Sequence, residues 1–158
     1  MNNDNNIELD NLTAPLWDKI KGQLTQESLS QLTSDQITLL AYAILREQLL
    51  EGGFVQLIQN GYGPFIFLNP FAKAMRLWGL KDFSKWLYDA RELYEKTQAA
   101  LETPTDTDEE FMALYEQFPE WDDFDDNFID VEPQVTKQVC EAYVSSTQTN
   151  NDNGKQEL

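Results

Sequence analysis

The chain has 158 residues, enough for one domain with an apolar core, and 41% of them are hydrophobic. Nineteen aromatic residues argue against global disorder despite a net charge of -17. This negative charge argues against direct binding to nucleic acid, because contacts to its phosphates need Lys and Arg. The polar N-terminus has no signal-peptide pattern, no apolar run approaches the roughly 20 residues of a membrane span, and Cys140 is single. These features predict a cytoplasmic protein without disulfides or membrane contact.

The N-terminal third predicts helices after a flexible start. Residues 1–12 are rich in Asn and Asp, and Pro15 then stands where a helix can begin. A second helix begins at Ser34 or Asp35 as its cap and ends at the glycine pair 52–53. Its broad apolar face predicts a central position in the core; that face consists of Ile37, Leu40, Ala41, Ile44, Leu45 and Leu49.

The middle third combines turns with two further helices. Residues 54–58 favour a short helix, residues 60–64 carry turn chemistry, and residues 65–68 are compatible with a helix or a strand. A helix is then predicted from Asn69–Pro70 to Gly79. A longer one follows from an Asp82 cap to about Leu101, with an apolar stripe of Phe83, Trp86, Leu87, Ala90, Leu93 and Tyr94.

Residues 97–136, here called the acidic segment, contain thirteen carboxylates and no Lys or Arg. Residues 111–118 predict a short amphipathic helix closed by Pro119, and residues 121–129 place their apolar side chains on one helical face. A last helix is predicted from about Pro133. The remaining residues, 146–158, have the composition of a disordered tail.

The predicted fold is therefore all-α: a single compact multi-helix domain over residues 13–145, with short polar tails at 1–12 and 146–158. The sequence shows no internal repeat and no interdomain linker.

Features of catalysis are missing. The chain has no histidine, no phosphate-binding loop and no dinucleotide fingerprint, and Cys140 fits a small core residue better than a nucleophile. A calcium loop starting at Asp123 would have Phe128 in place of the required glycine and Gln134 in place of the glutamate. We therefore expect a protein that is not an enzyme and has no cofactor or metal, with a glycosidase-type carboxylate pair as a remote alternative.

The acidic segment suggests an imitation of DNA. Carboxylates four residues apart on a helix lie about 6 Å apart along its axis, on the scale of successive phosphates on one DNA strand. Asp122, Asp126 and Asp130 would form such a row, and interleaved aromatic residues would anchor it to the core. We expect a basic DNA-binding protein to bind the following residues: Asp106, Asp108, Glu109, Glu110, Glu116, Asp122, Asp123, Asp125, Asp126 and Asp130.

Two other interpretations of the charge are open. Acidic surfaces are common and often only keep a protein in solution. The six cations of residues 73–96 would solvate two helices or neutralise the acidic segment from within; they are Lys73, Arg76, Lys81, Lys85, Arg91 and Lys96.

Residues 46–63 resemble the hallmark of a bacterial family of dimeric DNA-mimic proteins, many of whose members have no known function. The shared features are a helix that ends in Gly-Gly-Phe at residues 52–54, Gln56, and the turn at Asn60 and Gly61. The following helices over residues 69–79 and 82–101 agree in order and length, so that the resemblance covers about residues 34–145. It implies an all-helical fold, a homodimer, and binding to a helix-turn-helix transcription regulator that then leaves its operator. An immunity or antitoxin-like inhibitor of a basic nuclease would use the same acidic chemistry and is the alternative.

Overall fold

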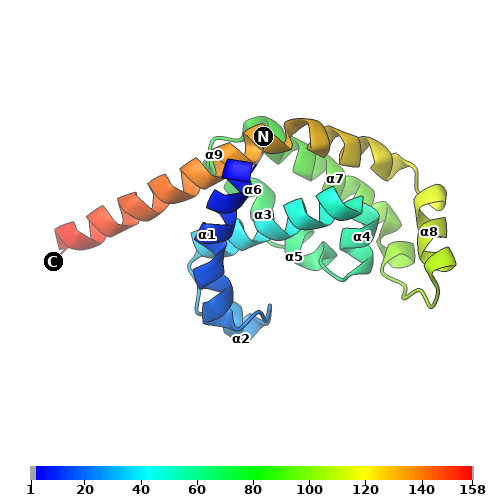
Figure 1. Ribbon diagram of the computed structural model, residues 1–158, viewed down its shortest axis with the longest axis horizontal. Helices are drawn as coiled ribbons and strands as arrows, with labels where there is room; N and C mark the ends of the chain where they lie inside the picture. The colour runs from blue at the N-terminus through cyan, green and yellow to red at the C-terminus, as the bar shows by residue number, and fades with distance from the viewer. Residues whose placement is uncertain (1–2, 158) are drawn as a thin grey trace.

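The apolar stripes of the sequence form helices, as predicted, and the all-α fold class is confirmed. A computed structural model describes residues 3–157, and within this range the chain has nine helices and no strand (Figure 1). The helices are α1 (Asn3–Ile20), α2 (Gln26–Leu29), α3 (Ser34–Glu51), α4 (Gly53–Gln59), α5 (Gly63–Phe67), α6 (Phe71–Leu77), α7 (Lys81–Leu101), α8 (Asp108–Gln117) and α9 (Glu120–Glu157).

Helix α3 lies at the centre of the fold and contacts α1, α4, α5, α6 and α9. Its N-terminus is closed by a capping box in which Thr33 and Gln36 exchange hydrogen bonds, and Thr33 stands one residue before Ser34, the first of the two predicted caps. Leu39, Leu40, Tyr42 and Leu45 are fully buried along it. The helix with the broadest predicted apolar face is therefore the core helix, as expected.

The turn from α3 into α4 depends on Gly53, whose φ of 81° is unfavourable for residues with a side chain. A Cβ atom at this position would also stand 2.2 Å from an Asp125 oxygen. The turn brings Phe54 into the core, where its ring packs against Trp121 of α9 at a centroid distance of 4.6 Å. The Gly-Gly-Phe sequence thus forms the corner against which the acidic segment packs.

Two helix bounds differ from the sequence-based expectations. Helix α1 begins at Asn3 rather than at Pro15, and the burial of Leu9 ties part of the predicted flexible segment to the core. The predicted break near Pro133 is absent, because α9 is continuous from Glu120 to Glu157. The backbone of residues 146–157 continues this helix, where the sequence favours a disordered tail, and it projects past the other helices (Figure 1). The division of the chain into a domain and two polar tails stays a prediction.

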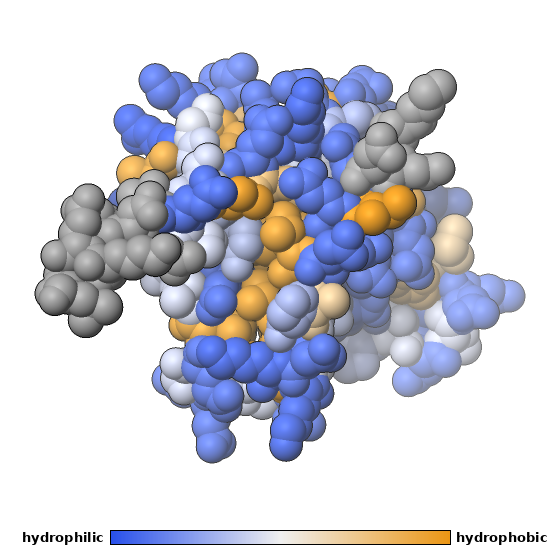
Figure 2. All heavy atoms as spheres, turned by 60° about the vertical axis from the view of Figure 1, so that its left-hand side comes forward, coloured by the Kyte–Doolittle hydropathy of each residue, from blue (hydrophilic) through white to orange (hydrophobic). Residues whose placement is uncertain are grey.

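Helix α8 and the end of α9 lie at opposite ends of the molecule (Figure 1). Figure 2 brings the end away from α8 forward and shows apolar side chains gathered in the middle of that face, surrounded by hydrophilic ones. Within the described residues, none of the helices combines the length and the apolar character that a membrane span requires.

Candidate protein-binding surface

Nine of the ten predicted partner-binding carboxylates are exposed on α8, on the loop before it, and on the first part of α9. We call these nine residues the acidic face: Asp106, Asp108, Glu109, Glu110, Glu116, Asp122, Asp123, Asp126 and Asp130. On α9 the row Asp122, Asp126 and Asp130 has the i, i+4 spacing that places its members on one side of a helix. Because these oxygens face solvent, they are available to a partner.

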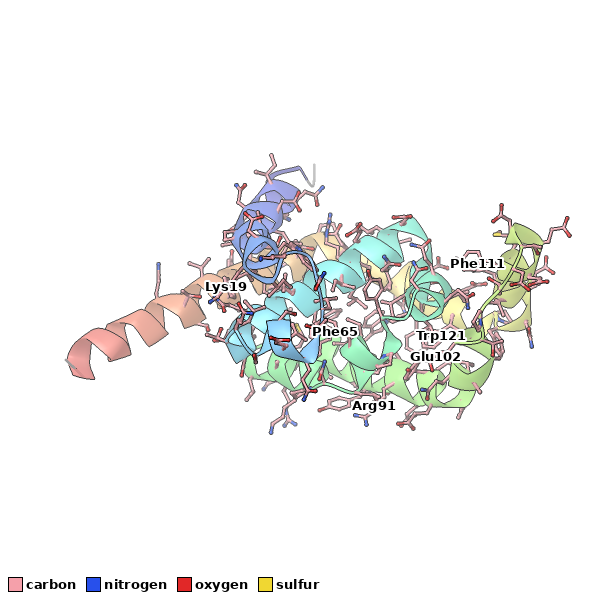
Figure 3. The ribbon with its side chains drawn as sticks, turned by 90° about the horizontal axis from the view of Figure 1, so that it is seen from below. Lys19, Phe65, Arg91, Glu102, Phe111 and Trp121 are labelled. Atoms are coloured by element: carbon pink, nitrogen blue, oxygen red, sulfur yellow. The ribbon has the colours of Figure 1, made fainter. Side chains whose placement is uncertain are left out.

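The opposite side of α9 holds the acidic face to the core. Trp121 and Phe128 are fully buried, and Phe124 is partly buried beside them. Trp121 donates its indole N–H to the Thr97 hydroxyl of α7 at 3.3 Å. Figure 3 shows Trp121 near the junction of α8 and α9, with Phe111 on α8. The aromatic anchoring predicted from the sequence is confirmed.

Helix N-termini accommodate part of the negative charge. Asp108, Glu109 and Glu110 occupy the first turn of α8, and Glu120, Asp122 and Asp123 occupy that of α9. The positive end of the helix dipole favours carboxylates in the first turn. Thr107 accepts the Glu110 N–H at 3.1 Å, and the Glu110 carboxylate accepts the Asp106 N–H at 2.8 Å, so that the start of α8 is well capped.

Asp125 is the exception, because its side chain points into the molecule. Its carboxylate accepts the Phe54 N–H at 2.9 Å, at the start of α4, and it is not part of the exposed row. Burial raises the pKa of this carboxyl to about 7, against the opposing effect of the Phe54 N–H, and Asp122 and Asp126 add to the rise. The placement of Asp125 indicates a structural role at the α3–α4 corner.

Helix α8 is joined to the same corner. The Tyr115 hydroxyl donates to the carbonyl oxygen of Gly52 at 2.7 Å, and Leu114 is the buried residue of this helix. Burial raises the pKa of Tyr115, and the negative charge of Asp125 adds to the effect. The α3–α4 corner therefore makes a hydrogen bond with each of the two helices that carry the acidic face.

Two further carboxylates of the acidic segment are used inside the fold. Glu102 accepts the Tyr94 hydroxyl at 2.7 Å, and Glu132, which is 2% exposed, lies 3.4 Å from Arg46. Glu132 also accepts the Thr136 hydroxyl at 2.7 Å. These two residues were not predicted to bind a partner, in agreement with their positions.

The cations of residues 73–96 do not neutralise the acidic segment. All six are exposed, and among the described side chains the ion pairs are Arg46 with Glu132 and Arg91 with Glu95 on α7. Of the two roles considered for these cations, solvation of helix surfaces agrees with the structure. The charge of the acidic face is therefore left uncompensated by the described part of the chain.

Groups suited to catalysis or metal binding are scarce around the acidic face. No cluster of three side chains able to hold a metal ion occurs among the described residues. Cys140 is buried, and this burial raises the pKa of its thiol to about 12. Its position agrees with the core role expected from the sequence.

The prediction missed some neighbours of the acidic face. Glu120 is exposed three residues before Asp123, a spacing that was readable from the sequence. The side chains of Ile129 and Val131 are 55% and 44% exposed on either side of Asp130. Exposed aliphatic residues inside an acidic row are a second signal that charge alone does not explain.

Comparison with known proteins identifies a family and a relative. The family model described as DMP19-like protein matches residues 30–147. A protein of Neisseria meningitidis serogroup B, named DNA mimic protein DMP19, is 40% identical to this chain over 127 residues. The match covers 80% of this chain and 77% of the relative.

Proposed function

This chain belongs to the DMP19-like protein family, and we propose that it is a DNA mimic whose acidic face occupies the phosphate-binding sites of a basic DNA-binding protein. The observation that carries the proposal is the exposure of nine carboxylates on a segment without Lys or Arg. A helix-turn-helix transcription regulator is the partner that we favour. Such a regulator presents Lys and Arg toward DNA phosphates, and these groups would meet carboxylates in the mimic.

The spacing of the acids supports this use. The row Asp122, Asp126 and Asp130 advances by about 6 Å per step along α9, since each residue of an α-helix rises about 1.5 Å. The buried aromatic side of α9 holds the row at this spacing, so that a partner does not need to order it. Binding to preordered charges costs less conformational entropy than binding to an acidic tail.

The mechanism is competition. A regulator whose phosphate-binding groups are covered by the acidic face cannot hold its operator at the same time, and DNA is released. Charge complementarity accelerates the encounter, and added salt weakens it. The protein itself carries out no covalent step in this scheme.

The test compares two variants of equal net charge. Asp122, Asp123, Asp126 and Asp130 are changed to Asn in one, and in the other Glu8→Gln, Asp10→Asn, Asp18→Asn and Glu27→Gln remove exposed acids from α1 and α2. Each is immobilised in parallel with the wild type and exposed to native lysate at about 0.1 M salt, followed by a salt gradient. We expect the wild type and the α1–α2 variant to retain the same basic protein. The acidic-face variant should bind it at least about tenfold more weakly.

The captured protein is then purified and bound to a fluorescent DNA duplex that carries its operator. We expect the wild type to displace this DNA and the acidic-face variant to fail. Equal capture by the acidic-face variant, or continued DNA binding in the complex, would contradict the proposal. A captured nuclease that the wild type inhibits would favour the alternative of an immunity protein.

A further inference from the structure

A groove separates the start of α7 from the middle of α9, two helices that run alongside each other (Figure 1). Its volume is about 670 Å³, within the range in which proteins bind organic groups. Phe83 and Trp86 of α7 line it together with Val131 and Val135 of α9. Asp130, the last carboxylate of the acidic face, lines the same groove. The groove is therefore continuous with the proposed binding surface.

The rim of this groove is mainly negative. Asp82 of α7 and Asp130 of α9 line it from opposite sides. Lys81 is the lysine in the lining. Two carboxylates and one ammonium group give the lining a net negative charge, which favours a cationic occupant.

The wall of the groove is apolar, which phosphate imitation alone does not require. Val131 is 44% exposed at the rim, and Val135 is buried below it. Ile129 is also an exposed aliphatic residue of α9, but unlike Val131 it does not line the groove. Contacts that exclude water slow dissociation, whereas exposed charges act mainly on association. A basic partner with an apolar side chain would use both the charged contacts and the contacts that exclude water.

We propose that the α7–α9 groove receives an apolar side chain from a basic amphipathic helix of the partner, while cations on that helix meet Asp82 and Asp130. This inference rests on the proposed function and adds the chemistry of the partner segment. Acidic and apolar contacts then occur side by side, as in other helix-in-groove complexes. The groove selects among basic proteins, and the acidic face attracts them.

The test uses two synthetic peptides of the same composition, about 18 residues of Lys and Leu, long enough to form a helix. One places its leucines on a single helical face, and the other distributes them around the helix. We expect the full-length protein to bind the amphipathic peptide roughly tenfold more tightly, since burial of one Leu side chain contributes on that scale. Because Trp86 lines the groove, its indole N–H signal in a ¹⁵N spectrum, assigned with Trp86→Phe, should shift with this peptide alone.

Two substitutions on α9 provide the matched pair. Val131→Gln should abolish the tenfold preference and leave the binding of the scrambled peptide unchanged. Ile129→Gln, which alters an exposed aliphatic residue outside the groove, should keep the preference. Thermal melts establish that both variants are folded.

Equal binding of the two peptides by the wild type, or a preserved preference in Val131→Gln, would overturn the groove proposal while leaving the acidic face intact. Failure of both peptides to bind, or binding that does not weaken with salt, would count against the proposed function and against this inference with it. An unchanged Trp86 signal during tight binding of the amphipathic peptide would place its leucines elsewhere and also overturn the inference.

Discussion

Asp125 shows how one carboxylate within an acidic run can have a structural role. Its oxygen accepts the Phe54 N–H, and burial raises its pKa to about 7. An acid whose pKa is raised by folding holds its proton more tightly in the folded state. Its ionisation therefore costs stability as the pH rises from about 4, where the unfolded chain titrates, to about 7.

Asp125→Asn should remove this cost, because the amide oxygen can still accept the Phe54 N–H and carries no charge. We expect the variant to gain stability over the wild type as the pH rises, with an advantage about 2 kcal/mol larger at pH 8 than at pH 5. Urea denaturation at both pH values measures the difference. Asp126→Asn, at the neighbouring exposed carboxylate, is the control and should show no comparable gain. A constant difference between Asp125→Asn and the wild type would disprove the assignment.

At the scale of elements, α9 is bound to α3 by a buried polar cluster. The Tyr42 hydroxyl lies 2.6 Å from that of Thr136, which donates to Glu132, and Arg46 pairs with the same carboxylate. Asn5 of α1 also donates to the Pro133 carbonyl oxygen at 3.0 Å. Polar groups on three helices thus fix how α9 lies across the core, and with it the direction of the acidic face.

Glu132→Ala should destabilise the protein strongly, by about 3 kcal/mol, since it leaves the Arg46 charge buried without its partner. Glu116→Ala, which removes an exposed carboxylate of the same acidic segment, should change stability by less than about 0.5 kcal/mol. The midpoint of urea unfolding gives both values. Similar losses in the two variants would show that the Arg46–Glu132 pair has no special role.

The elements also show what the sequence could and could not predict. Apolar spacing was sufficient for α3, α6 and α7, because their stripes face one core. The prediction of a helix break at Pro133 was wrong, although this residue lacks the N–H that would bond to the Ile129 carbonyl. Ile129 lies on the exposed side, where water can serve that carbonyl, and the burial of Phe128 and Val135 keeps the helix continuous on both sides.

The same limit applies to the candidate surface. Nine exposed carboxylates could be predicted because charged side chains rarely enter a core. The inward position of Asp125 could not, because it depends on a hydrogen bond to a residue 71 positions away in the sequence. The groove beside Asp130 depends in the same way on how α7 and α9 pack, which periodicity within one helix does not determine.

At the scale of the whole molecule, the charge of -17 is concentrated where cations are absent. The negatively charged carboxylates on α8 and α9 repel each other, and this repulsion opposes the folded state. The fold tolerates it through the helix N-termini and the aromatic anchors Trp121, Phe124 and Phe128. A surface that served solubility alone would gain nothing from concentrating its charges on two helices anchored to the core.

The destabilisation caused by this repulsion can be measured by varying the salt concentration. Raising NaCl from about 0.1 M to about 1 M shortens the screening length from about 10 Å to about 3 Å. It should therefore raise the thermal midpoint of the wild type more than that of the variant with Asn at positions 122, 123, 126 and 130. At low salt this variant should be the more stable protein, although it should bind the partner poorly. The α1–α2 variant of equal charge should respond like the wild type, since its substitutions leave the acidic face unchanged. Equal salt responses in all three proteins would mean that repulsion within the acidic face does not destabilise the fold. The position of these charges would then not reflect a compromise between stability and binding.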